Sequence, residues 1–286
     1  MLIVGGQRYW KFPRLFLLCE LSYYGGFAIK GVTMALARAF YKFLKKRKSH
    51  MKRFLLLTEV GKKLVPEYRY SWPYMDWYHD EAFNRYLKQF DELGHFNTDR
   101  RHMVYQLMRL IEGVSGDTVE CGSLEGAGSY LIHLMNERSG RHARWHHIFD
   151  SFEGLSAPED GDGSHWEQGD LSVSMQEVGS NMGTFDRYSL HKGWIPERFP
   201  DVEDKQFAFV HIDVDLFQPT FDAIEFFYPR LNPGGIILCD DYGSSLCPGA
   251  TRAIDEYLAD KPEKMLYMTC GSGFMIKGQE TAAQLS

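Results

Sequence analysis

Two apolar, strand-like runs of this chain each end in a pair of aspartates: Asp213 and Asp215 in the first, Asp240 and Asp241 in the second. Neighbouring parallel strands end at the same edge of a sheet, and side chains two positions apart share a side of a strand, so the four carboxylates should meet. Carboxylates this close raise one another's pKa unless a cation lies between them. Their oxygens suit a hard divalent ion such as Mg²⁺. A structural role as helix caps or turn residues would explain one pair of aspartates, but it explains two pairs at neighbouring strand ends poorly.

A glycine-rich turn provides a second candidate site. Residues 120–129 read ECGSLEGAGS and stand between a strand-like run and a helical pattern. Small residues let the backbone approach a ligand, and the N-terminus of a helix points free N–H groups at it. The G-x-x-x-G-x-G spacing differs from the G-x-G-x-x-G of dinucleotide-binding proteins. A plain turn from strand to helix would give the same pattern.

Acidic residues near this turn indicate the kind of ligand it takes. Asp150 ends the next strand-like run, where doubly wound folds place the carboxylate that accepts ribose hydroxyls, although it could also be a cap or turn residue. Glu120 and Glu125 disfavour a pyrophosphate but tolerate a ligand with a cationic centre and an ammonium group. Trp194 lies where such a fold places an adenine, either as a wall of that site or as a core aromatic.

Apolar runs that alternate with amphipathic helices must position these residues. The strand-like runs are Thr118–Cys121, His146–Phe149, Phe207–Ile212 and Ile236–Cys239. Helical spacing of apolar residues occurs at Val104, Leu107, Met108 and Ile111, at Tyr130, Leu131, Leu134 and Met135, and at Phe221, Ile224, Phe227 and Leu231. This alternation predicts an α/β fold with a doubly wound, mostly parallel sheet. Met265–Thr269 and Phe274–Lys277, around a Gly-Ser-Gly turn, predict a C-terminal antiparallel hairpin.

Three local features add to this picture. Residues 174–177 read SMQE, the form of a capping box that starts a helix. The loop 157–170, with His165 and Trp166, is long enough to cover a site. His211, just before the first aspartate pair, is expected to be a buried, hydrogen-bonded histidine.

The N-terminal part differs from the rest in charge. Residues 1–53 hold 12 Lys/Arg residues and one acid, whereas the remainder holds 20 basic and 37 acidic residues. Within 27–53 the apolar residues fall on one side of a helix and the lysines on the other. Such a basic amphipathic helix could lie on an anionic membrane surface or dock on the body of the protein. Nucleic-acid binding is not favoured, because the aromatic residues lie on the apolar face.

The chain divides into a helical N-terminal extension, residues 1–97, and an α/β domain, residues 98–286. The extension includes an aromatic-rich segment after its basic helix. Five cysteines without a C-x-x-C pair indicate neither a disulfide framework nor a thiolate zinc site. We therefore expect a cytoplasmic protein, in peripheral contact with the inner face of the membrane where its basic helix binds there.

In order and together, the motifs of residues 98–278 resemble those of the macrocin O-methyltransferase family, metal-dependent enzymes that use S-adenosylmethionine to methylate sugar hydroxyls of macrolides and aminocoumarins. The matching motifs are Val119-Glu120-Cys121-Gly122 with Gly126 and Gly128, Asp150-Ser151-Phe152-Glu153-Gly154-Leu155, Gly193-Trp194, His211-Ile212-Asp213-Val214-Asp215-Leu216-Phe217, Tyr228-Pro229-Arg230-Leu231 with Pro233-Gly234-Gly235, and Asp240-Asp241-Tyr242-Gly243. Phe217 stands where the family often has Tyr, and residues 1–70 are unlike the family's short N-terminal segment.

The resemblance implies a class I methyltransferase fold and a role for each candidate residue. Mg²⁺ would be held by Asp213, Asp240 and Asp241, with Asp215 as the general base or a further ligand. The residues expected around S-adenosylmethionine are Glu120, Gly122, Gly126, Ser129, Asp150, Ser151, Gly193 and Trp194.

The leading hypothesis is an O-methyltransferase that acts on a sugar-containing acceptor, such as a glycoside, a natural product or a polysaccharide precursor. A metal-dependent phosphoester hydrolase would use the four acids but leave the glycine-rich turn and Asp150 without a purpose. A third hypothesis is a non-catalytic ligand-binding module at the membrane surface. A homo-oligomer is compatible with all three.

Overall fold

The computed structural model describes residues 2–4, 7–9, 60, 75–93, 95, 97–138 and 144–282. The chain forms two compact units, Met1–Glu81 and Ala82–Ser286. In the smaller unit, β1 (Leu2–Val4) pairs with β2 (Gln7–Tyr9) in antiparallel fashion, and η3 spans Asp76–His79. The basic helix predicted at 27–53 lies outside the described residues. Among the residues described, no helix combines the length and the apolar character needed to cross a membrane.

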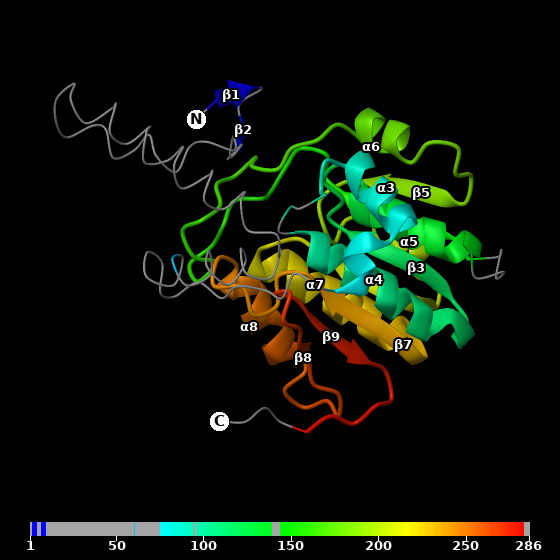
Figure 1. Ribbon diagram of the computed structural model, residues 1–286. Helices are drawn as coiled ribbons and strands as arrows, with labels where there is room; N and C mark the ends of the chain where they lie inside the picture. The colour runs from blue at the N-terminus through cyan, green and yellow to red at the C-terminus, as the bar shows by residue number, and fades with distance from the viewer. Residues whose placement is uncertain are drawn as a thin grey trace. The chain divides into compact units, whose positions relative to one another are not determined.

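Seven strands of the larger unit form one sheet in the order β5-β4-β3-β6-β7-β9-β8 (Figure 1). The strands are β3 (Asp117–Cys121), β4 (His146–Asp150), β5 (Tyr188–Lys192), β6 (Phe207–Ile212), β7 (Leu231–Cys239), β8 (Leu266–Tyr267) and β9 (Gly273–Ile276). The first five are parallel, while β9 runs antiparallel to both β7 and β8. The predicted doubly wound sheet and its C-terminal hairpin are confirmed. The strand order reverses between β3 and β6, the place where open α/β sheets bind ligands.

Helices cover both faces of this sheet, and α4 packs on α5 while α7 packs on α8. The helices are α3 (Glu81–Gln89), α4 (Asn97–Leu110), α5 (Ala127–Arg138), α6 (Met175–Asn181), α7 (Phe217–Phe227) and α8 (Pro248–Tyr257), with short 3-10 turns η4 (Ile111–Gly113), η5 (Phe199–Val202) and η6 (Tyr228–Arg230). Ser174 caps α6 as predicted, because its Oγ accepts the backbone N–H of Glu177 at 3.2 Å. The larger unit begins before residue 98, since Tyr86 in α3 donates its O–H to the carbonyl of Ala127.

One helix boundary differs from the prediction. Leu231 was expected on the apolar face of the helix that precedes it, but it is the first residue of β7. Helix α7 ends at Phe227, and the turn η6 carries Pro229. Proline has no backbone N–H to continue the helical hydrogen-bond pattern, so the chain leaves the helix before Leu231.

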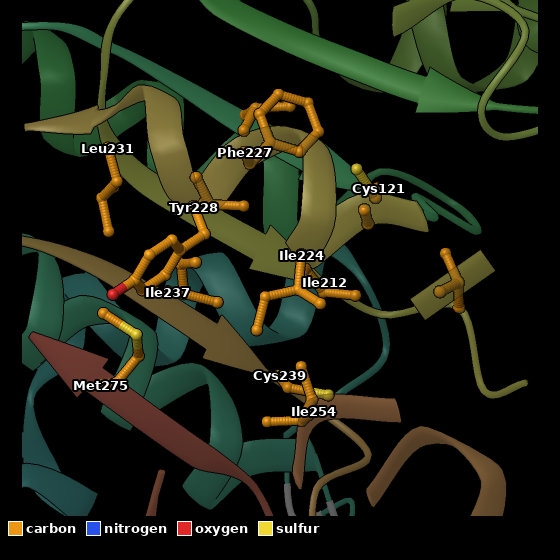
Figure 2. Packing of buried hydrophobic residues seen from close by; sticks show 14 of the residues in the cluster. Cys121, Ile212, Ile224, Phe227, Tyr228, Leu231, Ile237, Cys239, Ile254 and Met275 are labelled. Atoms are coloured by element: carbon orange, nitrogen blue, oxygen red, sulfur yellow. The ribbon is translucent and has the colours of Figure 1, made fainter. Parts of the chain in front are cut away.

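The core lies where α7 and α8 cover the sheet. All six residues of β6 are buried, which is typical of a central parallel strand covered on both faces. Figure 2 shows Ile224 and Phe227 from α7 and Ile254 from α8 gathered with Ile212 and Ile237 of the central strands. Two neighbouring strands are thereby held rigidly by their side chains, and both carry aspartates at their ends.

We expect the substitution Phe227→Ala to lower the free energy of unfolding by about 3–5 kcal/mol, because it leaves a cavity in this core. The Phe227 ring is fully buried, with ring centroids 4.9 Å from Phe199 and 5.0 Å from Phe207. Denaturant unfolding followed by circular dichroism measures the change. The control Leu110→Ala, at a side chain 63% exposed, should change it by less than about 0.5 kcal/mol. A loss below about 1 kcal/mol for Phe227→Ala would contradict this account of the core.

Candidate active site

A cavity of about 630 Å³ opens at the carboxyl edge of the sheet, beside the point where the strand order reverses. This volume is within the usual range for a site that holds a small molecule. Most of the residues predicted for a site line it: Glu120, Gly122, Asp150, Ser151, Trp194, Asp213, Asp215, Asp240 and Asp241. Gly126, Ser129 and Gly193 are not among the lining residues. The tertiary structure therefore brings both sequence-derived sites, the glycine-rich turn and the aspartates, into one cavity.

The glycine-rich turn is held against the end of β6. Gly122 has a φ of +82°, and a Cβ atom added to it would lie 1.9 Å from the carbonyl oxygen of Asp213. The backbone N–H of Asp213 donates to the carbonyl of Cys121 at 2.8 Å, which keeps the two chain segments together beyond the last paired strand residues. Only glycine accommodates both the left-handed backbone and this close approach.

Asp150 joins the turn to the end of β4. Its Oδ2 accepts hydrogen bonds from the backbone N–H of Ser123 at 2.7 Å and from the Ser123 hydroxyl at 2.9 Å. Its Oδ1 accepts the backbone N–H of Phe152 at 2.7 Å. A carboxylate has about four lone-pair positions, so Asp150 retains acceptor capacity on the cavity side while it shapes the turn.

The four aspartates lie together at the other end of the cavity. Asp215, Asp240 and Asp241 are buried, and Asp213 is partly buried. Asp241 Oδ2 accepts the backbone N–H of Asp215 at 3.0 Å. The expectation that Asp213 and Asp215 share one side of a regular strand is wrong, because β6 ends at Ile212 and Asp215 has a left-handed φ of 61°. A sharp turn after the strand brings it into the cavity beside Asp213.

Asp240 is the best-paired of the four acids. Its Oδ2 lies 2.5 Å from Nη1 of Arg100, and its Oδ1 accepts the hydroxyl of Ser272 at 3.3 Å. Arg100 also donates to the carbonyls of Cys270 and Gly271, so it ties α4 to the loop between β8 and β9. Sequence reasoning missed Arg100, because helical periodicity marks the apolar face of α4 and gives no sign of which polar residue reaches a site.

The electrostatics of the cavity separate Asp240 from its neighbours. Burial raises the pKa of Asp213 and of Asp241 well above the usual range, and the charges of nearby aspartates raise both further. Burial, with the charge of Asp213, raises the pKa of Asp215 to about 7. Burial also opposes ionisation of Asp240, but the nearby His211 imidazole and the charge of Arg100 outweigh it and lower its pKa. Asp213, Asp215 and Asp241 therefore lack enough positive charge nearby to hold their pKa values in the usual range.

The loop 157–170 lines part of the cavity, and both His165 and Trp166 are among the lining residues. Trp166 donates its indole N–H to the Sγ of Cys247 at 3.4 Å, and Cys247 in turn lies 3.3 Å from Oδ1 of Asp215. Asp162 accepts the backbone N–H of Phe217 at the start of α7, at 2.8 Å. These bonds attach the loop to the aspartate end of the cavity. Cys247 is a second residue that no sequence motif indicated.

Solved structures show which class of protein has this fold. The O-methyltransferase NovP superposes with a TM-score of 0.57 at 25% identity, over 64% of this chain and 81% of its own. The calicheamicin methyltransferase CalS11 superposes with a TM-score of 0.58 at 20% identity, over 82% of this chain and 95% of its own. The fold is therefore that of the class I methyltransferases.

The family is shown by sequence. The sequence model of macrocin-O-methyltransferase (TylF) matches residues 98–265, more than half of the chain, and the chain belongs to this family. It is 34% identical over 157 residues to the 8-demethyl-8-(2,3-dimethoxy-alpha-L-rhamnosyl)-tetracenomycin-C 4'-O-methyltransferase of Streptomyces olivaceus, covering 49% of this chain and 58% of that one. It is 30% identical over 157 residues to the demethyldecarbamoylnovobiocin O-methyltransferase of Streptomyces niveus, covering 51% and 59%. The matches span less than two thirds of the length of these relatives.

We expect Gly122→Ala to destabilise the protein by about 3 kcal/mol or more. The alanine would have to adopt a left-handed backbone conformation, and its Cβ atom would also overlap the carbonyl oxygen of Asp213. Gly183→Ala is the matched control: its φ is +66°, but a Cβ there meets nothing within 4 Å. That control should lose only about 1–2 kcal/mol. Urea unfolding of the two variants measures the difference, and equal losses would show that the approach of Gly122 to Asp213 is not a constraint.

Proposed function

We propose that this protein is a metal-dependent O-methyltransferase that moves a methyl group from S-adenosylmethionine to a hydroxyl of a sugar-containing acceptor. The observation that carries the proposal is that one cavity holds both sites, with the glycine-rich turn and Asp150 at one end and four aspartates at the other. The printed names of the relatives describe O-methylation of a rhamnosyl tetracenomycin and of a novobiocin precursor, which supports a glycoside acceptor.

The methyl donor would bind at the turn. We assign Gly122, Asp150, Ser151 and Trp194, which line the cavity, to contact the donor. Glu120, Gly126, Ser129 and Gly193 would support this end without contacting the donor directly. Asp150 has the acceptor capacity to bind ribose hydroxyls, and Trp194, which lies on the cavity wall, would contact the adenine. The acidic surroundings suit a donor that carries a sulfonium and an ammonium group, and they disfavour a pyrophosphate.

The aspartate end fits a hard divalent cation. Its donor atoms are carboxylate oxygens, and burial raises the pKa of Asp213 and Asp241, so added positive charge would stabilise their ionised forms. We assign Asp213, Asp240 and Asp241 as the residues that would hold Mg²⁺. When bound, such an ion orients an acceptor's neighbouring oxygens and makes its hydroxyl more acidic.

Asp215 is the residue we assign as general base. Its carboxylate faces the cavity, and the thiol of Cys247 lies 3.3 Å from one of its oxygens, which restricts its orientation. Burial raises its pKa above that of an exposed aspartate, and this strengthens it as a base. It would accept the hydroxyl proton as the new C–O bond forms and the donor's C–S bond breaks, which leaves S-adenosylhomocysteine.

The remaining parts of the chain have less specific roles. We infer that residues 98–286 carry the catalytic machinery, because the family match begins at residue 98. Residues 1–97 would be an extension whose helix α3 packs against that machinery through Tyr86. The basic pattern at 27–53 supports peripheral contact with an anionic membrane.

The donor site is tested by calorimetry with S-adenosylhomocysteine. We expect the protein to bind it, and Asp150→Asn to weaken binding about 10-fold or more through the loss of hydrogen bonds to a charged acceptor. Asp204→Asn, at a side chain 72% exposed on the surface, is the control and should bind normally. An absence of binding at high protein concentration would refute the methyltransferase assignment.

The metal is tested by methyl transfer to a panel of glycosides, with products detected by mass spectrometry. We expect EDTA to abolish transfer and Mg²⁺ to restore it. Substitution of a residue that only supports a metal ligand typically lowers activity roughly 10–100-fold. Asp213→Asn should lower the Mg²⁺-stimulated rate by more than this, because Asp213 is proposed to bind the metal itself. Its affinity for S-adenosylhomocysteine should stay nearly unchanged. Full turnover in EDTA would exclude the proposed role of the four aspartates.

A further inference from the structure

Glu120, which lines the cavity, forms a buried hydrogen-bonded line with His211 and Ser129, and the three residues come from three different elements. All three are at most 1% exposed. The Oγ of Ser129, in the first turn of α5, donates to Oε2 of Glu120. Nδ1 of His211 lies 2.8 Å from Oε1 of Glu120, and the two residues face each other across β3 and β6. Both oxygens of Glu120 are therefore bonded within the protein.

The far end of this line reaches Asp240. Nε2 of His211 lies 3.7 Å from Oδ1 of Asp240, an ion-pairing distance. This nitrogen is buried and makes no hydrogen bond to any residue that the structure describes. The imidazole thus has one nitrogen directed at Glu120 and the other at an aspartate assigned to the metal.

Space for Glu120 depends on a glycine of the turn. A Cβ atom on Gly128 would lie 2.0 Å from Oε1 of Glu120. The third glycine of the G-x-x-x-G-x-G pattern is thereby explained by one of the protein's own carboxylates rather than by the approach of a ligand. A side chain at position 128 would therefore displace a carboxylate whose two oxygens are both bonded within the protein.

We propose that His211 and Glu120 are positioning residues that hold the donor-binding turn and the metal ligand Asp240 in one fixed geometry. This inference rests on the proposed function. Glu120 acts at the turn through Ser129, and His211 acts at the metal site through Asp240. The imidazole of His211 connects the turn to the metal site. Its Nδ1 supports the binding of the donor through Glu120, and its Nε2 supports the binding of the metal through Asp240.

The two nitrogens can be separated by substitution. The amide nitrogen of His211→Asn can take the place of Nδ1 but is too short to reach Asp240. The amide of His211→Gln can take the place of Nε2 but leaves Glu120 without its partner. Each variant is measured twice: by calorimetry with S-adenosylhomocysteine in EDTA, and by electron paramagnetic resonance with Mn²⁺ in the absence of any donor analogue.

We expect His211→Asn to lower Mn²⁺ affinity about 10-fold and to leave S-adenosylhomocysteine affinity within about twofold of the unsubstituted protein. We expect His211→Gln to do the opposite. Unchanged affinities in both variants, or equal losses of both ligands in each, would overturn the proposal, because a residue that merely packs cannot separate the two ligands. If the unsubstituted protein binds neither ligand, the proposed function itself fails, and the two failures are thus distinct.

A second pair of variants covers the case in which the histidine variants do not fold. Glu120→Gln can still bond both Ser129 and His211, so it should keep both affinities within about threefold. Glu120→Ala loses both bonds and should weaken both ligands about 10-fold or more. The alternative is that Glu120 contacts the donor's ammonium group directly. In that case Glu120→Gln would weaken S-adenosylhomocysteine binding as much as Glu120→Ala does, while its Mn²⁺ binding stayed normal. This result would show that the proposal is wrong.

Discussion

The site depends on one close approach, where β3 and β6 end side by side at the reversal of the strand order. At this point the backbone of Gly122 lies against the carbonyl of Asp213, and the Asp213 N–H closes on Cys121. The glycine-rich turn follows one strand and the aspartates follow the other, so backbone contacts hold the two halves of the cavity together. A larger residue at Gly122 would change both halves together.

A second constraint is electrostatic. The aspartates are taken out of water at the carboxyl edge of the sheet, and Arg100 and His211 direct positive or hydrogen-bonding groups at only one of them, Asp240. The remaining acids are destabilised in their ionised forms by burial and by one another. Carboxylates grouped in this way have the charge and the donor atoms that a hard divalent cation requires, and the proposed base, Asp215, belongs to the same group. The proposed binding and catalytic roles therefore have a common physical origin.

Much of the fold could be predicted from local patterns. The runs at β3, β4, β6 and β7 alternate with helices, and Ser174 caps α6 as its spacing requires. Patterns failed where a single residue overrode periodicity: Pro229 ends α7 before Leu231, and a left-handed backbone at Asp215 replaces strand alternation. Hydrophobic periodicity averages over several residues, so it cannot report a break made by one.

The sequence by itself determined the order of the motifs, the residue types at the strand ends and hence the family, because these are properties of short segments. Only the tertiary structure decided that Arg100 pairs with Asp240, that Cys247 lies beside Asp215, and that Gly128 makes room for Glu120. These partners are separated by 140 and 32 residues in the first two cases. The first two contacts join α4 and the segment before α8 to the residues that follow β7 and β6, and local spacing in the chain carries no trace of them.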